Sequence, residues 1–368
     1  MWEKGAAAYS ETFATVTAQA ENELLDAAAV PRTAHSRVKF VYSIGGAQIP
    51  KYNQAAQPLP RLPPGDEVKA LSEPASFRVL DVACGTGGNA MAAAARGATE
   101  VVGLDASKAM VGIATKRAGE TEGVSFVVGD ATKLPGADNS FDAVTIGFGL
   151  LHLQQPELAL AEAYRVLKPG GKLAFTVWHE NPGFEIVNGA ISAHGNADVA
   201  PDSGAPPFFH FSDKENAKAA LTKAGFDAAS FAVSNVPIQA ALTSEHDLYE
   251  MFAGATARTR ATLELQTPSQ TEAIKAAMSD AVRSRFQGNF LNGITHTTSR
   301  YPERGMPGTD AVLMDGRPSG RSLFYVPMGA VVASATKAAP KAAPKAAPKA
   351  EAAPKAEKPK KAAAKPKA

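Results

Sequence analysis

Three aspartates stand where short apolar segments of the sequence end. Asp81 lies within Arg78–Ala83, Asp105 follows Glu100–Leu104, and Asp130 comes two residues after Ser125–Val128. Each segment has the length and apolar content of a buried β-strand. If these strands are parallel neighbours, their carboxyl ends share one edge of a sheet, where α/β proteins bind ligands. Three carboxylates gathered there would favour a cationic ligand that also offers hydroxyl and amino donors.

Glycines mark the same strand ends. Gly85 and Gly87 follow the first strand and precede an alanine-rich segment, and glycine there lets the backbone turn tightly and approach a bulky ligand. Gly147 follows the strand predicted at 141–146 and leaves room beside the ligand in the same way. Asp105, twenty residues after Gly85, is placed to accept both hydroxyls of a ribose. Asp130 is placed to accept from the exocyclic amine of an adenine.

A nicotinamide dehydrogenase is the main competing interpretation of these glycines. Residues 85–90, Gly-Thr-Gly-Gly-Asn-Ala, satisfy the relaxed dinucleotide fingerprint. Asp81 argues against it, because a dinucleotide-binding strand is normally apolar at that position and a carboxylate would repel a pyrophosphate. A ligand that carries an ammonium and a sulfonium would be attracted instead. We therefore expect a cationic nucleoside.

The elements that must position these residues alternate between strand and helix. We expect strands at 78–83, 100–104, 125–128, 141–146 and 172–178, and helices at 88–96, 107–118 and 156–167. Short apolar strands that alternate with helices of this length predict a parallel sheet covered on both faces. The core of this α/β domain therefore spans 77–178.

The remaining segments are less regular. Residues 1–30 have helical spacing that Pro31 ends, and 31–76 form an insertion or linker with four prolines between residues 58 and 64. Within 179–290 we expect a helix at 213–224, a strand at 231–236 and mostly helix over 244–287. A loop at 291–322 precedes a final strand at 323–335, interrupted at Pro327 as suits an edge or a bend. One domain, 77–336, thus carries seven strands.

Composition restricts the setting of the protein. The only cysteine is Cys84, so the chain forms no internal disulfide and builds no thiolate metal site, and we expect a reducing, cytoplasmic location. We expect no metal, no transmembrane span and no secretion signal. Residues 337–368 hold ten lysines and two glutamates, for a local charge of +8, whereas residues 1–336 carry −6. Proline at every fourth position predicts a disordered tail, either solubilising or weakly attracted to nucleic acid.

The motifs together resemble a known family. Residues 79–87, Val-Leu-Asp-Val-Ala-Cys-Gly-Thr-Gly, resemble motif I of class I S-adenosylmethionine-dependent methyltransferases, which have a Rossmann-like fold. Residues 129–135, 139–142, 150–153 and 162–171 resemble the later motifs, in the branch related to ubiquinone/menaquinone-biosynthesis methyltransferases.

This resemblance implies S-adenosylmethionine as cofactor and assigns its contacts. Asp81 with the backbone of Gly85 and Gly87 would hold the methionine moiety, and Tyr9 its carboxylate. The cofactor-binding set is completed by Ala83, Asp105, Ala106, Asp130, Ala131 and Gly147. Ala83 departs from the family, which more often has glycine at that position.

The reaction we expect is an in-line displacement of the activated methyl by a small, partly apolar acceptor. Holding both partners aligned can lower the barrier by roughly 7–11 kcal/mol. His152 is the candidate general base, because it follows the fourth strand near the expected entry of substrate. The helical region 179–290 is expected to form a lid. The alternatives are a protein or RNA methyltransferase, which only the basic tail supports, and a non-catalytic cofactor-binding scaffold.

Overall fold

The computed structural model describes residues 2–32, 43–44, 47–48, 76–199, 203–286 and 324–339. Contacts divide the chain into one unit, Met1–Ala338, and a second, Ala339–Ala368. The predicted loop at 291–322 and the predicted tail beyond residue 339 lie outside the described residues, as does most of the predicted linker. Within that linker, β1 (Ser43–Ile44) and β2 (Ala47–Gln48) form a short antiparallel pair.

Seven strands form one sheet, in the order β5-β4-β3-β6-β7-β11-β8. They are β3 (Arg78–Val82), β4 (Glu100–Asp105), β5 (Val124–Val128), β6 (Phe141–Gly147), β7 (Leu167–Trp178), β8 (Ala232–Val236) and β11 (Ala330–Thr336). The pairs that join β5, β4, β3, β6 and β7 are parallel. β11 alone runs antiparallel to both of its neighbours. The predicted seven-stranded, mostly parallel sheet is confirmed.

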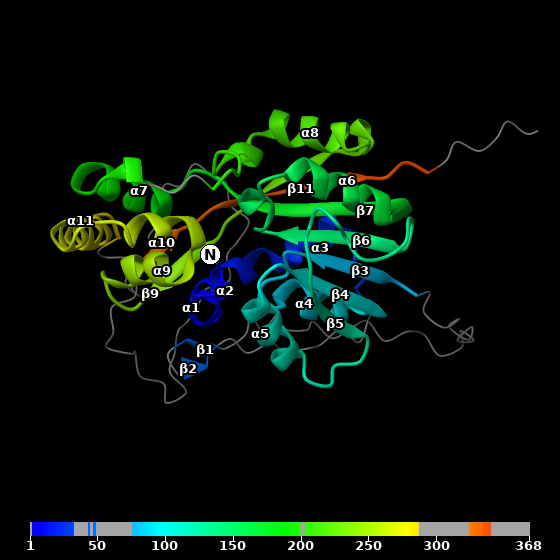
Figure 1. Cartoon of the computed structure of the whole chain (residues 1–368), viewed down its shortest axis with the longest axis horizontal. Coiled ribbons are helices and arrows are strands. Elements are labelled where there is room, and N and C mark those ends of the chain that lie inside the picture. The colour runs from blue at the N-terminus through cyan, green and yellow to red at the C-terminus, as the bar shows by residue number, and fades with distance from the viewer. Residues whose placement is uncertain are drawn as a thin grey trace, which may run out of the picture. The chain divides into compact units, whose positions relative to one another are not determined.

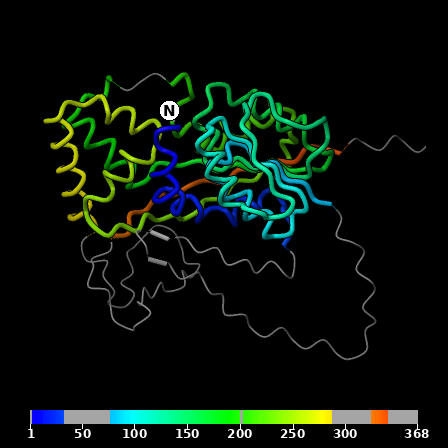
Figure 2. The backbone as a smooth tube through the Cα atoms, turned by 60° about the horizontal axis from the view of Figure 1, so that its bottom comes forward, coloured from blue at the N-terminus to red at the C-terminus, as the bar shows by residue number. Residues whose placement is uncertain are grey.

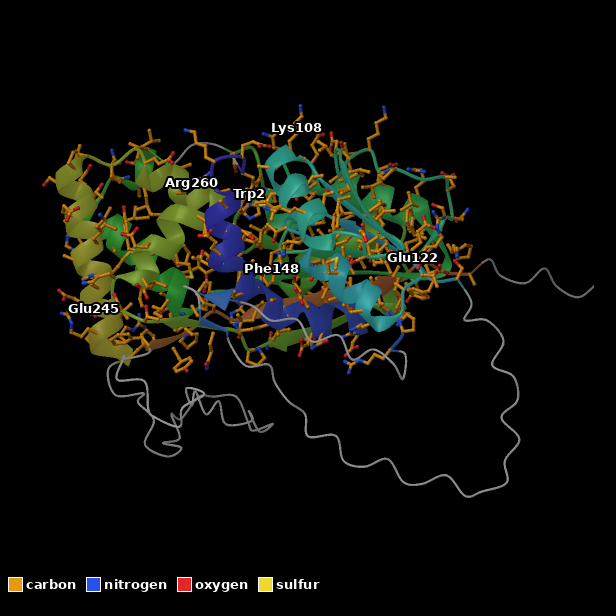
Figure 3. The ribbon with its side chains drawn as sticks, turned by 90° about the horizontal axis from the view of Figure 1, so that it is seen from below. Trp2, Lys108, Glu122, Phe148, Glu245 and Arg260 are labelled. Atoms are coloured by element: carbon orange, nitrogen blue, oxygen red, sulfur yellow. The ribbon has the colours of Figure 1, made fainter. Side chains whose placement is uncertain are left out.

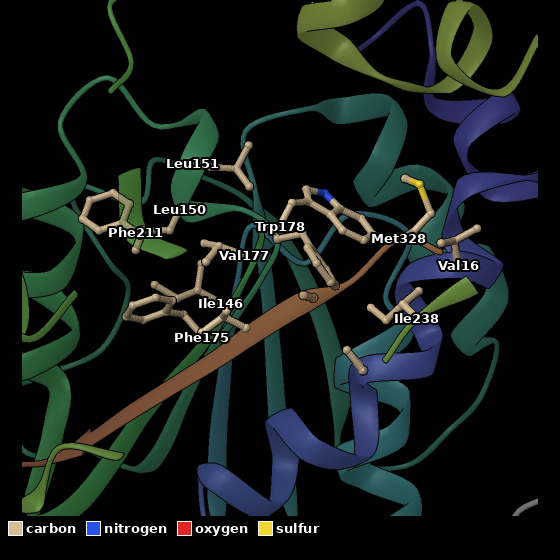
Figure 4. Close-up of a cluster of buried hydrophobic side chains, with 14 of the residues drawn as sticks. Val16, Ile146, Leu150, Leu151, Phe175, Val177, Trp178, Phe211, Ile238 and Met328 are labelled. Carbon is tan, nitrogen blue, oxygen red and sulfur yellow. The ribbon is translucent and has the colours of Figure 1, made fainter. Parts of the chain in front are cut away.

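Helices cover both faces of this sheet (Figure 1). One face carries α3 (Glu21–Ala27), α4 (Gly88–Arg96) and α5 (Lys108–Ala118), and the other carries α6 (Pro156–Val166) and α8 (Lys214–Lys223). Leu24 and Ala90 pack with Val79 in the smaller apolar cluster. Leu160 and Leu221 belong to the larger cluster on the opposite face. Figure 4 shows the part of the larger cluster built on β6 and β7.

Strand geometry decides which side each residue of β3 faces. Successive side chains of a strand point to opposite faces of the sheet. Val79 belongs to the cluster beneath α3 and α4, and Leu80 and Val82 belong to the other. Asp81 therefore shares the face of Val79 and points toward α4.

The start of the N-terminal segment and helices of the region predicted as a lid lie together beside the sheet (Figures 1 and 2). The segment comprises α1 (Ala6–Glu11), α2 (Phe13–Thr17) and α3, and the lid region comprises α7 (Pro182–His194), α9 (Asp247–Ala255), α10 (Ala257–Leu263) and α11 (Pro268–Phe286). Single-turn 3-10 helices lie at Ala18–Ala20, Leu150–His152, Ala197–Val199, His210–Ser212 and Ala228–Ser230. α1 contacts both α9 and α5, so it bridges the lid region and the sheet. Helices thus occupy most of residues 6–27 and 247–286, within the segments predicted as helical at 1–30 and 244–287.

The final strand is where sequence and structure differ. The segment predicted as one strand is two: β10 (Phe324–Pro327) pairs with β9 (Gln239–Leu242) in a separate sheet, and β11 enters the main one. Pro327 thus marks a bend rather than an edge of the main sheet. β7 also begins at Leu167, earlier than predicted, because Leu167 pairs with Phe141 of β6, and Gly170 and Gly171 then pair with Lys337 beyond the end of β11.

No helix among the described residues is long and apolar enough to span a membrane.

Candidate functional site

The turn after β3 holds its backbone in a conformation that few residues adopt. Gly85 and Gly87 have φ of +54° and +85°, and Ala83 has φ of +53°. Positive φ is uncommon for a residue with a Cβ. The methyl group of Ala83 has space because Gly149 faces it: a Cβ on Gly149 would lie 2.4 Å from that of Ala83. The departure of Ala83 from the family pattern is therefore accommodated by a glycine on the neighbouring turn.

Asp81 is fully buried beneath this turn. Its Oδ1 accepts a hydrogen bond of 2.8 Å from the Thr145 hydroxyl, and Oδ2 accepts none from any described residue. Burial raises the pKa of the Asp81 carboxyl to about 7, opposed mainly by the Thr145 hydrogen bond. The Ala90 N–H and the Asn89 side chain face the carboxyl and lower its pKa slightly, but neither reaches Oδ2 with hydrogen-bond geometry. Asp81 itself does not line the cavity that opens at this turn.

Asp105 holds the same turn from the end of β4. Its Oδ2 accepts from the Gly85 N–H and its Oδ1 from the Ser107 N–H, each at 2.9 Å. Burial raises the pKa of this carboxyl, and the two backbone donors oppose the rise. Each oxygen keeps a further lone pair for a ligand hydroxyl. Ala106 beside it is exposed.

The predicted adenine contacts lie further out. Asp130 is exposed, and its Oδ1 accepts the Thr132 N–H at 2.8 Å, which closes an Asx turn. Ala131 is buried beneath it. Neither residue lines the cavity described next.

A cavity of about 50 Å³ opens at the turn after β3. Its walls come from the N-terminal segment, the turn, α5 and the end of β6: Tyr9, Ala14, Thr17, Glu21, Ala83, Cys84, Gly85, Thr86, Gly88, Asn89, Arg117, Gly147 and Phe148. Four of the predicted cofactor residues, Tyr9, Ala83, Gly85 and Gly147, are among them.

Tyr9 brings a neutral hydroxyl to this cavity. Its Oη lies 3.1 Å from Oγ1 of Thr17. Burial raises the pKa of the Tyr9 phenol to about 12, so it stays protonated and can donate to an anionic ligand group.

Sequence reasoning missed two charged residues of the cavity, Glu21 and Arg117. Both sit on helices whose patterns are explained by packing and by helix-end charge, Arg117 in the last turn of α5 and Glu21 in the first turn of α3. No local motif separates them from surface charges. Only the folded arrangement of α3 and α5 around the turn places them at one site.

An aromatic wall adjoins the cavity on the side of the lid region. Phe148 stacks on Trp178 at a ring separation of 4.2 Å, and Phe184 packs against Trp178, Phe208 and Phe252. Phe148 also lines the cavity, so wall and cavity are continuous. Phe148, Trp178, Phe184 and Phe252 are themselves buried, so the cavity meets this cluster only through Phe148.

His152 stands at the edge of this wall. Its half-buried ring packs edge-on against Trp2 at 5.1 Å and against Phe208 at 6.3 Å. Burial, with a smaller effect of Arg258, lowers the pKa of His152 to about 3. Its ring makes no hydrogen bond to a described residue, and at this pKa the imidazole is neutral and only a weak base. Figure 3 shows Trp2 and Phe148 between α10, which carries Arg260, and α5, which carries Lys108.

The donor set around the cavity fits one kind of ligand. The buried Asp81 carboxyl has an unbonded oxygen, Asp105 keeps acceptor capacity, and Glu21 adds a third carboxyl. The carboxyls attract a cation and accept from hydroxyls, whereas Arg117, which also lines the cavity, adds one positive charge. The site therefore fits a cationic nucleoside.

Proteins with similar sequences are methyltransferases, the class that the sequence motifs between residues 79 and 171 predict. A family model described as a methyltransferase domain matches residues 80–175. The chain is 50% identical over 106 residues to the demethylmenaquinone methyltransferase of Renibacterium salmoninarum, across 29% of this chain and 43% of the relative.

Two further relatives give the same picture. The demethylmenaquinone methyltransferase of Clavibacter sepedonicus is 36% identical over 169 residues, across 43% of this chain and 69% of the relative. The ubiquinone/menaquinone biosynthesis C-methyltransferase of Methylobacterium nodulans is 45% identical over 122 residues, across 32% of this chain and 48% of the relative. The chain thus spans about half the length of these relatives. It belongs to the class I methyltransferase family that contains the ubiquinone- and menaquinone-biosynthesis methyltransferases.

Proposed function

We propose that this protein transfers a methyl group from S-adenosylmethionine to a small, partly apolar acceptor. The observation that carries the proposal is the buried Asp81 carboxyl, whose Oδ2 has no donor among the described residues, beneath a glycine-rich turn that opens into a cavity. A cationic ligand above that turn would stabilise the ionised carboxylate. When bound, S-adenosylmethionine supplies a methyl group that its sulfonium activates.

Different residues of the site would contact different parts of the cofactor. The turn at Gly85 and Gly87 admits the ligand close to the backbone, and Tyr9 offers its hydroxyl to the methionine carboxylate. Asp105 accepts the ribose hydroxyls with the oxygens that already hold the turn. The remaining proposed contacts, Ala106, Asp130 and Ala131, lie toward the adenine, and Gly147 leaves room on the side of β6.

The acceptor would lie against the aromatic wall. Phe148 lines the cavity and Phe208 is half-buried, so these two rings would meet an apolar molecule, while the buried Phe184 packs behind Phe208. The names of the relatives point to demethylmenaquinone, a ring compound of this character. His152 would be the proton acceptor, as a weak base, if the acceptor must lose a proton at attack, and α7, α9 and α10 would close over it.

Calorimetry with S-adenosylmethionine and with NAD tests the proposed ligand. We expect binding of the first and none of the second. Tight binding of NAD without S-adenosylmethionine would overturn the proposal.

A second measurement concerns Asp105. Asp105→Ala should weaken S-adenosylmethionine binding by roughly tenfold to a hundredfold, because it removes a charged acceptor of ligand hydrogen bonds. The variant must stay folded, as judged by its circular dichroism spectrum. An unchanged affinity would contradict the ribose assignment.

The acceptor itself can be found by label transfer. Purified protein incubated with methyl-labelled cofactor and a cell extract should place label in small apolar metabolites. Label confined to protein or RNA would favour those acceptor classes instead.

A further inference from the structure

Two opposite charges from separate elements meet at the cavity. Glu21 comes from the N-terminal segment, at the start of α3, and Arg117 comes from the last turn of α5. Both line the cavity together with the glycine-rich turn. Neither residue is among the cofactor contacts proposed above. A cavity wall with one cation and one anion complements a zwitterion.

Arg117 is anchored to the turn by a single nitrogen. Its Nη1 donates to the backbone oxygen of Thr86 at 3.1 Å and to the Thr86 hydroxyl at 2.9 Å. Among the described residues it forms no ion pair, and Nε and Nη2 donate to none of them. A guanidinium presents five donors in a planar fork that matches a carboxylate. Most of that fork is therefore available to a ligand, while Thr86 fixes its position.

Glu21 reaches the other side of the turn because residue 88 is glycine. A Cβ on Gly88 would lie 2.5 Å from Oε1 of Glu21. Tyr9 lines the same cavity, and Glu21 raises and Arg117 lowers the pKa of its phenol. The two side chains thus act on one small volume next to the turn.

We propose that Arg117 binds the carboxylate and Glu21 the ammonium of the amino-acid end of the cofactor. The inference rests on the proposed function and deepens it. The two residues make the site specific for the whole zwitterionic cofactor over a nucleoside that lacks the amino-acid end. They also join the N-terminal segment to α5 through the ligand.

Two ligands that differ only at this end test the assignment. S-adenosylhomocysteine carries the amino-acid group, and 5′-methylthioadenosine lacks it. By calorimetry, Arg117→Gln should weaken S-adenosylhomocysteine binding by roughly tenfold to a hundredfold and change 5′-methylthioadenosine binding less than about twofold. Lys116→Gln, which removes the neighbouring exposed charge on the same helix turn, should leave both affinities unchanged.

Glu21 is tested in the same way, with one variant and one control variant. Glu21→Gln should weaken S-adenosylhomocysteine by roughly three- to tenfold and spare 5′-methylthioadenosine, whereas the exposed Glu23→Gln should affect neither. Arg117→Lys, which keeps the charge without the fork, should fall between wild type and Arg117→Gln.

The outcomes separate the two proposals. Equal losses for both ligands in Arg117→Gln would mean that Arg117 only holds the Thr86 turn, and would overturn the inference. No loss for either ligand would overturn it as well, while wild-type binding of S-adenosylhomocysteine would leave the proposed function standing. Failure of the wild-type protein to bind either ligand would overturn the proposed function itself.

Discussion

The Asp81 carboxyl has no exposed surface, and this makes its ionisation a measurable property of the fold. Its pKa rises from an ordinary 3.8 to about 7. A carboxyl with a higher pKa in the folded than in the unfolded chain binds its proton more tightly when folded. It therefore favours folding at low pH, and this contribution is lost as the pH rises from about 4 to about 7.

Asp81→Asn should remove this dependence. In the ligand-free protein, the free energy of unfolding of the variant relative to wild type should increase by roughly 2–4 kcal/mol between pH 4 and pH 8. Urea unfolding at several pH values measures the difference. The exposed Asp130→Asn is the control and should show no such trend. A pH-independent difference for Asp81→Asn would mean that the buried carboxyl is ionised throughout.

His152 is a second residue whose protonation state is set by burial. Because burial lowers its pKa to about 3, the ring is neutral at every pH used for assay. If it takes a proton from the acceptor, His152→Phe should lower the rate of methyl transfer by roughly a hundredfold or more. The affinity for S-adenosylhomocysteine should stay within about twofold, since the phenyl ring can keep the packing against Trp2 and Phe208.

The readout for His152 is the initial rate of label transfer to the metabolite that wild-type protein labels. The rate of the wild-type protein should show no decrease between pH 8 and pH 5 that depends on His152. A variant with an undiminished rate would reduce His152 to a packing residue.

At the scale of elements, the N-terminal segment and the lid region are joined at Gly5. A Cβ on Gly5 would lie 2.0 Å from Nη1 of Arg260 and 3.2 Å from the Gly254 carbonyl oxygen. Arg260 is itself buried and donates to that carbonyl. The contact between α1 and the α9–α10 corner thus depends on the absence of one side chain.

Gly5→Ala should loosen this contact, because the buried guanidinium cannot yield at low cost. We expect faster amide hydrogen exchange over residues 6–20 and a several-fold weaker affinity for S-adenosylhomocysteine. Gly254→Ala is the matched control at the same interface, since its Cβ would meet Ala8 at an ordinary 3.5 Å. Equal exchange in the two variants would show that the segment does not depend on this packing.

The elements also show what sequence can predict. The strands from β3 to β7 and the helices between them follow from short-range apolar patterns, and they emerge at nearly the expected residues. The pairing of β9 with β10 joins segments some eighty residues apart, for which no local pattern exists. The residues of the site also differ in how far sequence predicts them. Gly85 and Asp105 are predictable because they stand beside strand ends. Arg117 and Glu21 are not, because they reach the cavity only through helix packing.

At the scale of the whole molecule, an excess of basic residues and an excess of acidic residues lie in different parts of the sequence. Residues 337–368 carry a net charge of +8 and residues 1–336 carry −6. The seventh strand, β11, ends at Thr336, and Lys337 still donates from Nζ to the backbone oxygen of Tyr164 at 2.8 Å. A truncation should therefore keep residues up to 339 and remove the lysines beyond them.

A chain ending at residue 339 should bind S-adenosylhomocysteine as the full chain does, within about twofold, because every cavity residue lies before that point. Its methylation of a small acceptor should be equally unaffected. Binding to an RNA or DNA oligonucleotide at low salt should be lost, since the remaining charge is negative and phosphate attraction scales with the number of lysines engaged. Filter binding over a series of salt concentrations measures the second effect and calorimetry the first. If truncation instead abolished methyl transfer while cofactor affinity stayed intact, the lysines would be presenting a polyanionic acceptor, and a nucleic acid would replace the small metabolite as the substrate.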